Sequence, residues 1–210
     1  MLEYRLIKKE ELRKCAEICA GAYLDYEYFS IFVKDKKKLF DFILAIMRTA
    51  LNAGYKKQVV LVGIDQEQIV SVAQLKKPNT KELSFGSCFL SGALRIFLAG
   101  GVKSTIEWLN MSEASEQACR RIPEPRWYLN SFIVAKDHQR EGIGSSMLQN
   151  CVIPYIAKHG GGPLTLVTNS EGNSEFYKKN GFAEFCFEHL FYMNTDLGNW
   201  SFKKEIPNSV

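Results

Sequence analysis

The second half of the chain alternates between strand patterns and helix patterns, and this alternation limits the fold to classes that contain both. A run of aromatic and β-branched residues predicts a strand over Trp127–Val134. Apolar residues at helical spacing predict a helix over Ile143–Lys158, loosened by Pro154. A second strand and a short helix follow at Leu164–Thr168 and Asn173–Lys179. The pattern predicts an α+β architecture.

The first third of the chain carries the same two patterns. They predict a strand at residues 3–8, helices at Glu10–Phe29 and Lys38–Ala53, and strands at Gln58–Ile64 and Gln68–Leu75 joined by a hairpin turn at residues 65–67. Gly54 is expected just beyond the second helix, as its C′ residue. At the other end of the chain, Phe182–Met193 and Trp200–Glu205 predict a closing antiparallel pair around a polar turn.

Residues 79–122 interrupt this regular order with apolar helical stretches at Leu90–Ala99 and Val102–Leu109. We expect a helical insertion within a single domain that spans residues 1–210.

Part of this region, Leu83–Val102, is about long enough to span a bilayer. Arg95 lies inside it, however, and a charge in midspan costs about 2.5–3.5 kcal/mol even on lenient insertion scales. We therefore expect a buried or pocket-lining helix and no membrane insertion.

Composition excludes several other classes of protein. The chain has 210 residues, of which 46% are hydrophobic and 24% charged, which is typical of globular proteins and not of disordered or collagen-like chains. The net charge of +4, with scattered basic residues, gives no argument for nucleic acid. The six cysteines form no CxxC pair and no zinc-spaced set, so no metal is expected. The N-terminus has no apolar stretch typical of a signal peptide, so we expect a cytoplasmic protein.

The loop that ends in Gly142-Ile143-Gly144 leads from a predicted strand directly into a predicted helix. The first turn of a helix presents unpaired N–H groups and a positive dipole end, and glycine lets an anion approach the backbone. Gln139, Arg140 and Ser145 flank the turn with further donors. The spacing departs from both the Rossmann and the P-loop fingerprints. On the glycines alone, an ordinary tight turn is the preferred interpretation.

Two segments in this region change that balance. The stretch Val134–Leu148, VAKDHQREGIGSSML, resembles the acetyl-CoA signature of the GCN5-related N-acetyltransferase (GNAT) family. Downstream, Asn173–Phe182, NSEFYKKNGF, is similar to a second block of that family, in the expected order. Residues 126–182 also resemble the puromycin-acetyltransferase-like branch. The resemblance is strong over residues 126–193, limited to element order over residues 1–78, and absent over residues 79–122.

The resemblance implies a fold, a cosubstrate and a set of site residues. The fold is a mixed, mostly antiparallel sheet flanked by helices, and the cosubstrate is acetyl-CoA. The backbone at the end of a splayed strand would pair with the pantetheine arm, the next loop would hold the pyrophosphate, and an asparagine would contact the arm. The residues at these positions are Phe132, Ile133 and Val134 for the strand, Gln139, Arg140, Glu141, Gly142, Ile143, Gly144 and Ser145 for the loop, and Asn173 for the asparagine.

Tyr177 matches the family's general acid, which protonates the departing thiolate of coenzyme A. A positioned general acid is worth about 10²–10⁴ in rate. The alternative for Tyr177 is an aromatic side chain that fills the core beside Phe176. The resemblance further implies that a backbone N–H near Val134 polarises the thioester carbonyl.

The chain departs from the branch pattern at two positions that matter for a general base. Relatives often carry glutamate where this chain has Val167 and asparagine where it has Ser170. The attacking amine must still lose a proton, because only the neutral amine has a lone pair that can attack. A water chain or another carboxylate must therefore serve. A third departure, Lys136 in place of the usual proline, lies before the phosphate-binding turn, and we expect it to be tolerated.

The acceptor is expected to be a primary amine of a small molecule. The cluster Tyr23, Asp25, Tyr26, Glu27, Tyr28 and Phe29 would suit a cationic amine. The alternative, slightly preferred, is a helix end whose rings pack inward while its acids face water. Three other functions remain open: acetylation of a protein amine, non-catalytic binding of acyl-CoA, and a protein-interaction module. The resemblance also allows a homodimer.

Overall fold

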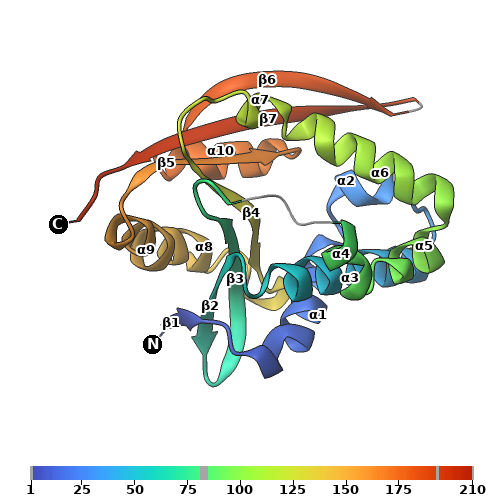
Figure 1. The fold of residues 1–210 in the computed structure, drawn as a ribbon, viewed down its shortest axis with the longest axis horizontal. Coiled ribbons are helices and arrows are strands. Elements are labelled where there is room, and N and C mark those ends of the chain that lie inside the picture. Colours follow the sequence, from blue (N-terminus) through green and yellow to red (C-terminus); the bar gives the residue numbers. More distant parts are fainter. Residues whose placement is uncertain (1, 81–84, 193, 210) are drawn as a thin grey trace.

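The computed structural model describes residues 2–80, 85–192 and 194–209, and a seven-stranded sheet runs through its centre (Figure 1). The strand order is β1-β2-β3-β4-β5-β7-β6. Neighbouring strands are antiparallel except β4 and β5, which are parallel. The strands are β1 Glu3–Leu6, β2 Val59–Asp65, β3 Gln68–Lys76, β4 Trp127–Val134, β5 Gly162–Thr168, β6 Ala183–Tyr192 and β7 Thr195–Ile206. The sheet is therefore mixed and mostly antiparallel.

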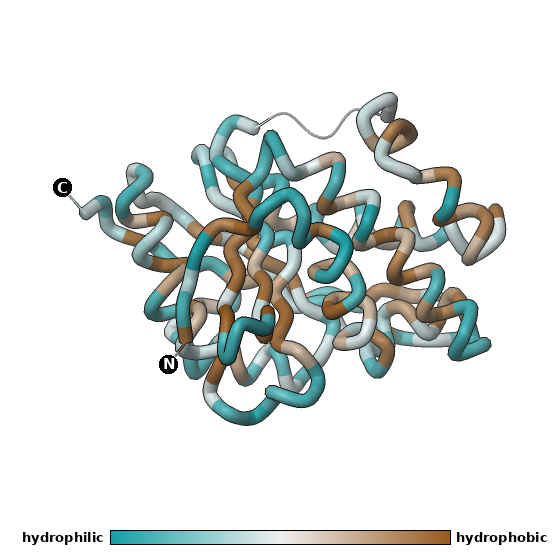
Figure 2. Tube along the Cα trace, turned by 90° about the horizontal axis from the view of Figure 1, so that it is seen from below, coloured by the Kyte–Doolittle hydropathy of each residue, from teal (hydrophilic) through white to brown (hydrophobic). Residues whose placement is uncertain are grey.

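Helices cover both faces of this sheet. They are α1 Leu12–Tyr23, α2 Glu27–Ser30, α3 Lys36–Gly54, α4 Phe85–Leu90, α5 Leu94–Gly100, α6 Val102–Ser115, α7 Gln117–Arg120, α8 Ile143–Met147, α9 Ile153–Lys158 and α10 Glu171–Lys179. Side chains alternate along β2, so that Val60 and Val62 pack with α1 and α3, whereas Val59 and Leu61 pack with α8 and α9. The apolar residues gather in the inner strands and the helix faces turned toward them (Figure 2).

The first predicted helix, Glu10–Phe29, is in fact two helices. The chain leaves α1 at Tyr23 and starts α2 at Glu27, because Tyr26 has extended backbone (φ −89°, ψ 113°) and its N–H bonds to the Tyr23 carbonyl instead of continuing the helix. Because of this break, the aromatic side chains of the segment do not form one stripe along a single helix. The pattern of apolar residues did not reveal it.

The second predicted helix has nearly the expected bounds, but Gly54 is its last residue and not its C′ residue. Its backbone is not left-handed, and the ends of two glutamine side chains occupy the space beside it. A Cβ there would lie 2.8 Å from Gln58 Oε1 and 2.9 Å from Gln74 Nε2. Gly54 therefore lets the end of α3 approach the start of the sheet.

The helix predicted over Ile143–Lys158 contains a π-helical turn at Leu148–Val152, between α8 and α9. Pro154 follows this turn and cannot donate a backbone hydrogen bond, which accounts for the loosened bonding pattern. Both closing strands are present, although β7 begins at Thr195 and is longer than the expected Trp200–Glu205. Met193, at the end of the other predicted strand, lies outside the described residues.

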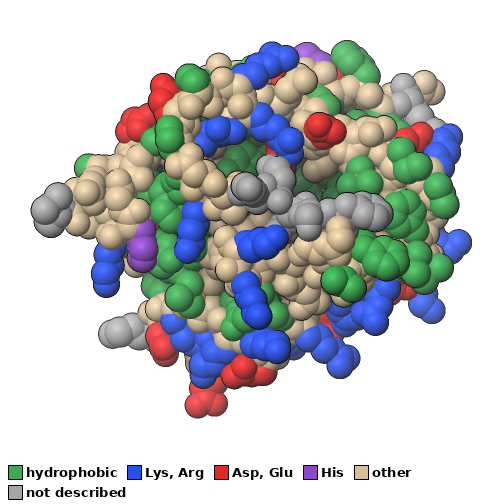
Figure 3. Space-filling view, in the orientation of Figure 1, with side chains coloured by type: hydrophobic (Ala, Val, Ile, Leu, Met, Phe, Trp, Pro, Cys, Tyr) green, Lys and Arg blue, Asp and Glu red, His purple; other side chains and the backbone are tan. Residues whose placement is uncertain are grey.

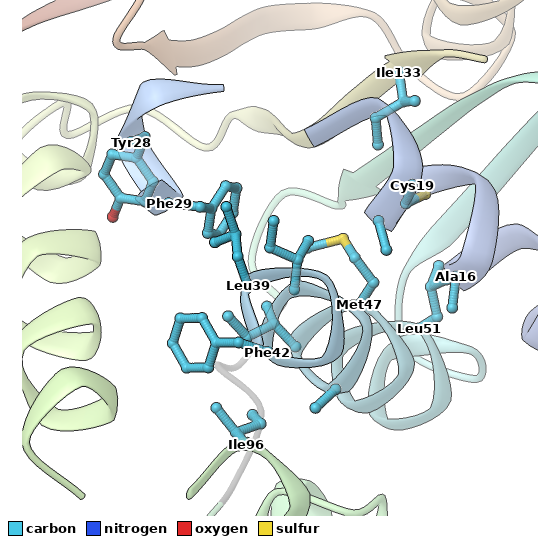
Figure 4. Close-up of a cluster of buried hydrophobic side chains, with 14 of the residues drawn as sticks. Ala16, Cys19, Tyr28, Phe29, Leu39, Phe42, Met47, Leu51, Ile96 and Ile133 are labelled. Carbon is cyan, nitrogen blue, oxygen red and sulfur yellow. The ribbon is translucent and has the colours of Figure 1, made fainter. Parts of the chain in front are cut away.

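The predicted insertion forms α4 to α7 and packs against α3 (Figure 4). Gly100 sits against the ring of Phe42, where a Cβ would lie 2.4 Å from a ring carbon. Trp108 meets the same ring edge-on with centroids 6.0 Å apart. The far end of α6 is attached to the sheet, where Asn199 Nδ2 donates to the Ser115 carbonyl at 3.1 Å. The insertion is thus held at both ends.

The segment Leu83–Val102 is not one helix. Its first two residues lie outside the described residues, and α4 and α5 are separated at Gly92, whose φ is +105°. No helix in the described part of the chain has the length and apolar character needed to cross a membrane.

Candidate functional site

The parallel strands β4 and β5 part after only two residue pairs. Trp127 pairs with Leu164 and Tyr128 with Thr165, and the two strands share no further ladder. On its other side, β4 pairs with β3 through an irregular register, in which Gln74 lies opposite Ser131 and Leu75 lies opposite Leu129. Asn130 is therefore the extra residue of a β-bulge. From Leu129 onward, no strand in the described part of the chain pairs with the edge of β4 that faces β5, and the Tyr23 hydroxyl contacts the backbone of Phe132 there.

A cavity of about 620 Å³ lies at this gap, which is within the usual range for a small-molecule site. Its lining comes from segments spread along the chain, among them the bulged part of β4, the end of β5, α10, the α1–α2 loop, α3, and the insertion helices α5 and α6. The face of the molecule in Figure 3 is hollowed near its centre, with hydrophobic side chains visible inside the hollow. The insertion thus forms part of the site, although the family motifs noted in the sequence do not extend to residues 79–122.

At the other end of the gap, the loop after β4 presents consecutive free backbone donors. Gly142 has φ +78° and caps α8, and Arg140 also has positive φ, at +69°. Among the described residues, no protein acceptor receives a backbone hydrogen bond from Arg140 through Ser145. Because α8, the π-helical turn and α9 run on without a break, these N–H groups stand at the N-terminus of one long helical segment. The arrangement suits a phosphate group.

The side chains of the loop offer fewer free hydrogen-bond donors to a ligand than the sequence suggested. Gln139 Nε2 donates to the Val134 carbonyl at 3.2 Å, so this amide closes the loop and is not an outward donor. Ser145 Oγ accepts from Asn180 Nδ2 at 3.2 Å, and Glu141 lies 3.3 Å from His138 Nδ1. Only the Arg140 side chain is left as an exposed flanking donor.

The two isoleucines of the predicted set face the interior. Ile133 is buried in the core beneath α1 and α3, and Ile143 is buried at the start of α8. Each can present only its backbone to a ligand.

Gly144 joins the loop to α10. A Cβ on Gly144 would lie 3.2 Å from the ring of Phe176 and 3.6 Å from Val134 Cγ2, so glycine is needed for this close approach. Phe176 in turn stacks on Phe132 with centroids 6.0 Å apart. The structure therefore brings together the three predicted segments, namely the end of β4, the loop and α10.

Tyr177 is 7% exposed and lines the cavity. Its ring also packs in the core with Phe132, Phe182 and Phe202. Burial, together with the neighbouring Tyr23 and Tyr26 hydroxyls, raises the pKa of Tyr177 well above its usual value. Asn173 lines the cavity one helical turn earlier on α10.

Two tyrosines of the predicted aromatic cluster stand in the gap between the strands. Tyr26 Oη accepts a hydrogen bond from the backbone N–H of Asn169 at 2.6 Å and lies 3.3 Å from Thr168 Oγ1, at the end of β5. Tyr23, whose ring is 5.8 Å from that of Tyr26, lies toward β4, and burial raises its pKa.

The acids of the same cluster point away from the cavity. Asp25 and Glu27 are exposed, and Asp25 pairs with Lys136 Nζ at 2.5 Å, which links the α1–α2 loop to the loop after β4. The preferred alternative, with rings inward and acids in water, is confirmed. The cavity wall here is therefore aromatic and not acidic.

Among the described residues, the charged side chains that line the cavity are Glu116 and Lys76. Glu116 Oε2 lies 3.5 Å from Lys76 Nζ and 3.0 Å from Arg120 Nη2. Val167 also lines the cavity and offers no proton acceptor. No group of three or more potential metal ligands occurs within the described residues.

Asn130, Asn169 and Glu116 were not anticipated from the sequence. The only available signal was the polar pair Asn130-Ser131, which interrupts an otherwise apolar strand.

Comparisons with known proteins agree with this geometry. A family model described as an acetyltransferase (GNAT) domain matches residues 105–184. The match begins at Thr105, inside the segment 79–122, so the similarity extends further toward the N-terminus than the sequence motifs indicated.

Several solved structures share the whole architecture. A histone acetyltransferase and related acetyltransferase from Corynebacterium glutamicum is 16% identical, with a TM-score of 0.67 over 100% of this chain and 97% of that one. A polyamine N-acetyltransferase from Drosophila melanogaster is 13% identical, with a TM-score of 0.62 over 98% and 100%. A ribosomal-protein-alanine N-acetyltransferase from Escherichia coli is 13% identical, with a TM-score of 0.59 over 100% and 97%.

These likenesses establish the fold. The chain has the GNAT fold, a mixed seven-stranded sheet flanked by helices, as predicted. The family model that matches residues 105–184 is that of an acetyltransferase (GNAT) domain, and the solved structures add the fold alone.

Proposed function

We propose that this chain, which has the GNAT fold, transfers an acetyl group from acetyl-CoA to a primary amine of a small molecule. The observation that carries the proposal is the gap between β4 and β5. It has the free N–H groups of Arg140–Ser145 at one end and the cavity lined by Tyr177 at the other. A long cosubstrate with a phosphate group at one end and a reactive thioester at the other fits such a gap.

The residues present fit coenzyme A. In the proposal, the free N–H groups of Arg140–Ser145 hold the pyrophosphate, whereas the Gln139 N–H remains bonded to the Lys136 carbonyl. The edge of β4 at residues 132–134, which has no strand partner, pairs with the pantetheine arm. Asn173, at the mouth of the cavity, contacts the same arm. Phe132, Ile133 and Ile143 act through their backbone, because their side chains pack inward.

The reaction needs a neutral amine, which attacks the thioester carbonyl so that a C–N bond forms and the C–S bond breaks. A backbone N–H on this edge of β4 stabilises the oxyanion of the tetrahedral intermediate. Val167 supplies no base, and Glu116 is already paired with Lys76 and Arg120. The amine therefore loses its proton to water in the cavity.

Tyr177 donates a hydrogen bond to the departing sulfur. Burial raises the pKa of Tyr177 above its usual value, so the phenol is a much weaker acid than the thiol of coenzyme A. Complete proton transfer would leave a buried phenolate, which is costly. The hydrogen bond stabilises the thiolate, and the proton released by the amine completes the thiol.

The test is the variant Tyr177→Phe, with Tyr155→Phe as the matched control. Tyr155 lies on α9, where its ring stacks on His159, and it does not line the cavity. We expect acetyl-CoA to raise the melting temperature of both variants. Thiol release with a panel of amines should fall about 100-fold in Tyr177→Phe and stay unchanged in Tyr155→Phe.

Each alternative gives a different result in this test. Stabilisation by acetyl-CoA without thiol release from any amine identifies a non-catalytic acyl-CoA binder. Thiol release only with peptides identifies a protein amine as the acceptor. The absence of any stabilisation leaves a protein-interaction module and contradicts the proposal.

Five further expectations remain predictions. They are the puromycin-acetyltransferase-like branch, the single domain over residues 1–210, the homodimer, the cytoplasmic location and a reaction without metal.

A further inference from the structure

The cavity extends beyond Tyr177 into a compartment between α3 and the insertion. Its walls are apolar and partly aromatic, and are formed by Ile46, Met47, Ile96, Phe97, Trp108 and Leu109. Figure 4 shows Ile96 on α5 near Phe42 of α3, whereas the Met47 side chain leaves α3 on the side nearer Cys19 and Ile133. The compartment is rigidly built, because the insertion is fixed to α3 through Gly100 and Phe42 and to β7 through Ser115 and Asn199.

Within residues 2–80, 85–192 and 194–209, this compartment offers no carboxylate that lacks a cationic partner. The acids beside the aromatic wall, Asp25 and Glu27, are exposed to solvent. Glu116 is the carboxylate in the described cavity lining, and Lys76 and Arg120 already lie 3.5 Å and 3.0 Å from it. A ligand ammonium placed here would lose its water without gaining an anionic partner.

The polar atoms at the bottom of the compartment are neutral. Thr49 is 6% exposed, lines the cavity, and its hydroxyl has no hydrogen-bond partner among the described residues. Close by in the lining, Gln74 Nε2 donates to Gln58 Oε1 at 2.6 Å. Hydroxyl and amide groups recognise neutral polar groups, whereas a second ammonium requires a carboxylate.

We infer that the acceptor is a primary monoamine with a bulky, mainly apolar and aromatic body. This inference rests on the proposed function and names its substrate class. The attacking amine is neutral when it reacts, so a monoamine brings no remaining charge into the compartment. A polyamine would bring further ammonium groups, which aromatic rings alone compensate only in part. The body of the proposed monoamine fills the space between the aromatic α1–α2 loop and Trp108.

The experiment compares acetyl transfer to tryptamine and 4-phenylbutylamine with transfer to spermidine, agmatine and an alanine-initiated peptide. The full chain is used with acetyl-CoA, and binding of each amine to the chain loaded with CoA is measured by calorimetry. We expect kcat/KM for the two arylalkylamines to exceed that for the others about tenfold or more.

Variants locate the preference in the compartment. Trp108→Ala should raise KM for the arylalkylamines about tenfold and leave CoA affinity unchanged. Phe191→Ala, at a 75% exposed position on β6 outside the cavity, serves as the control and should change neither quantity. Leu109→Glu, which adds a carboxylate at a half-exposed position in the lining, should shift the preference toward agmatine and spermidine.

The outcomes separate this inference from the proposed function. Higher kcat/KM or tighter binding for a polyamine or the peptide overturns the inference and leaves acetyl transfer intact. Binding of CoA with no detectable binding of either arylalkylamine also overturns it. If CoA itself does not bind, the proposed function fails, and the inference fails with it.

Discussion

The Tyr26 hydroxyl accepts a hydrogen bond from the backbone N–H of Asn169 at 2.6 Å. This contact joins the loop after α1 to the end of β5, 143 residues later in the chain. It places an aromatic ring beside the gap that the two parallel strands leave open. One side chain from the first helical region thus helps to define a site whose recognisable motifs all lie after residue 126.

The first prediction concerns this contact. Tyr26→Phe removes the acceptor of a partly buried N–H group and should lower the free energy of unfolding by about 1 kcal/mol. For a chain of this length, the melting temperature should fall by roughly 2–4 °C. Tyr55→Phe is the control, since its hydroxyl makes no hydrogen bond among the described residues. Equal melting temperatures for the two variants would contradict the prediction.

A second prediction separates phosphate binding from backbone strain. Gly142 and Gly160 both have positive φ, at +78° and +101°, and a Cβ would meet no atom within 4 Å at either position. Gly142→Ala and Gly160→Ala should therefore each cost about 1–2 kcal/mol of stability through strain alone. Only Gly142→Ala should also weaken CoA binding, by about tenfold in Kd measured by calorimetry. Similar Kd values would show that the loop does not hold the phosphates.

The third prediction uses two buried threonines on helices. The Thr49 hydroxyl has no partner within the described structure, whereas Thr105 Oγ1 donates to the Gly101 carbonyl at 2.7 Å. Thr49→Val should stabilise the protein by about 1 kcal/mol, because an unsatisfied buried hydroxyl is removed. Thr105→Val should destabilise it by about 1 kcal/mol, because a hydrogen bond is lost. Urea unfolding measures both changes, and the opposite signs are the decisive result.

The fourth prediction concerns high pH. Burial raises the pKa values of Tyr23, Tyr28, Tyr128 and Tyr177 above their usual range. The folded chain therefore keeps its phenol protons where the unfolded chain, with pKa values near 10, releases them. Stability is fully present below about pH 10 and is lost as the pH rises above it. Urea unfolding at about pH 8 and pH 10.5 should show a lower free energy of unfolding at the higher pH.

The raised pKa of Tyr177 also leads to a prediction about the pH dependence of kcat. Its hydroxyl should stay protonated between about pH 7 and pH 10, so kcat should show no decline in that interval from this residue. A decline near pH 9 that disappears in Tyr177→Phe would show that the phenol ionises during turnover.

The strand, loop and helix around residues 127–147 could be predicted because their signals are local. Trp127–Val134 has the bounds expected from its aromatic and β-branched residues, and Gly142 adopts the left-handed conformation that the loop requires. The break after Tyr23 could not be predicted, because it depends on where the rings of Tyr23 and Tyr26 find partners on β4 and β5. The contribution of the insertion to the site could not be predicted either, because Gly100 and Trp108 are explained only by their contacts with Phe42, which lies on another helix.

The bulge at Asn130 fixes more than the shape of one strand. Because of the extra residue, Leu129 and Phe132 face the core beneath α8 to α10, whereas Ile133 faces the core beneath α1 and α3. If Asn130 instead took the place of Ser131 opposite Gln74 in a regular ladder, each later residue would shift by one position. Phe132 and Ile133 would then exchange faces, and each core would receive the wrong side chain. The one residue left out of the ladder therefore decides which of the two cores each later side chain of β4 enters.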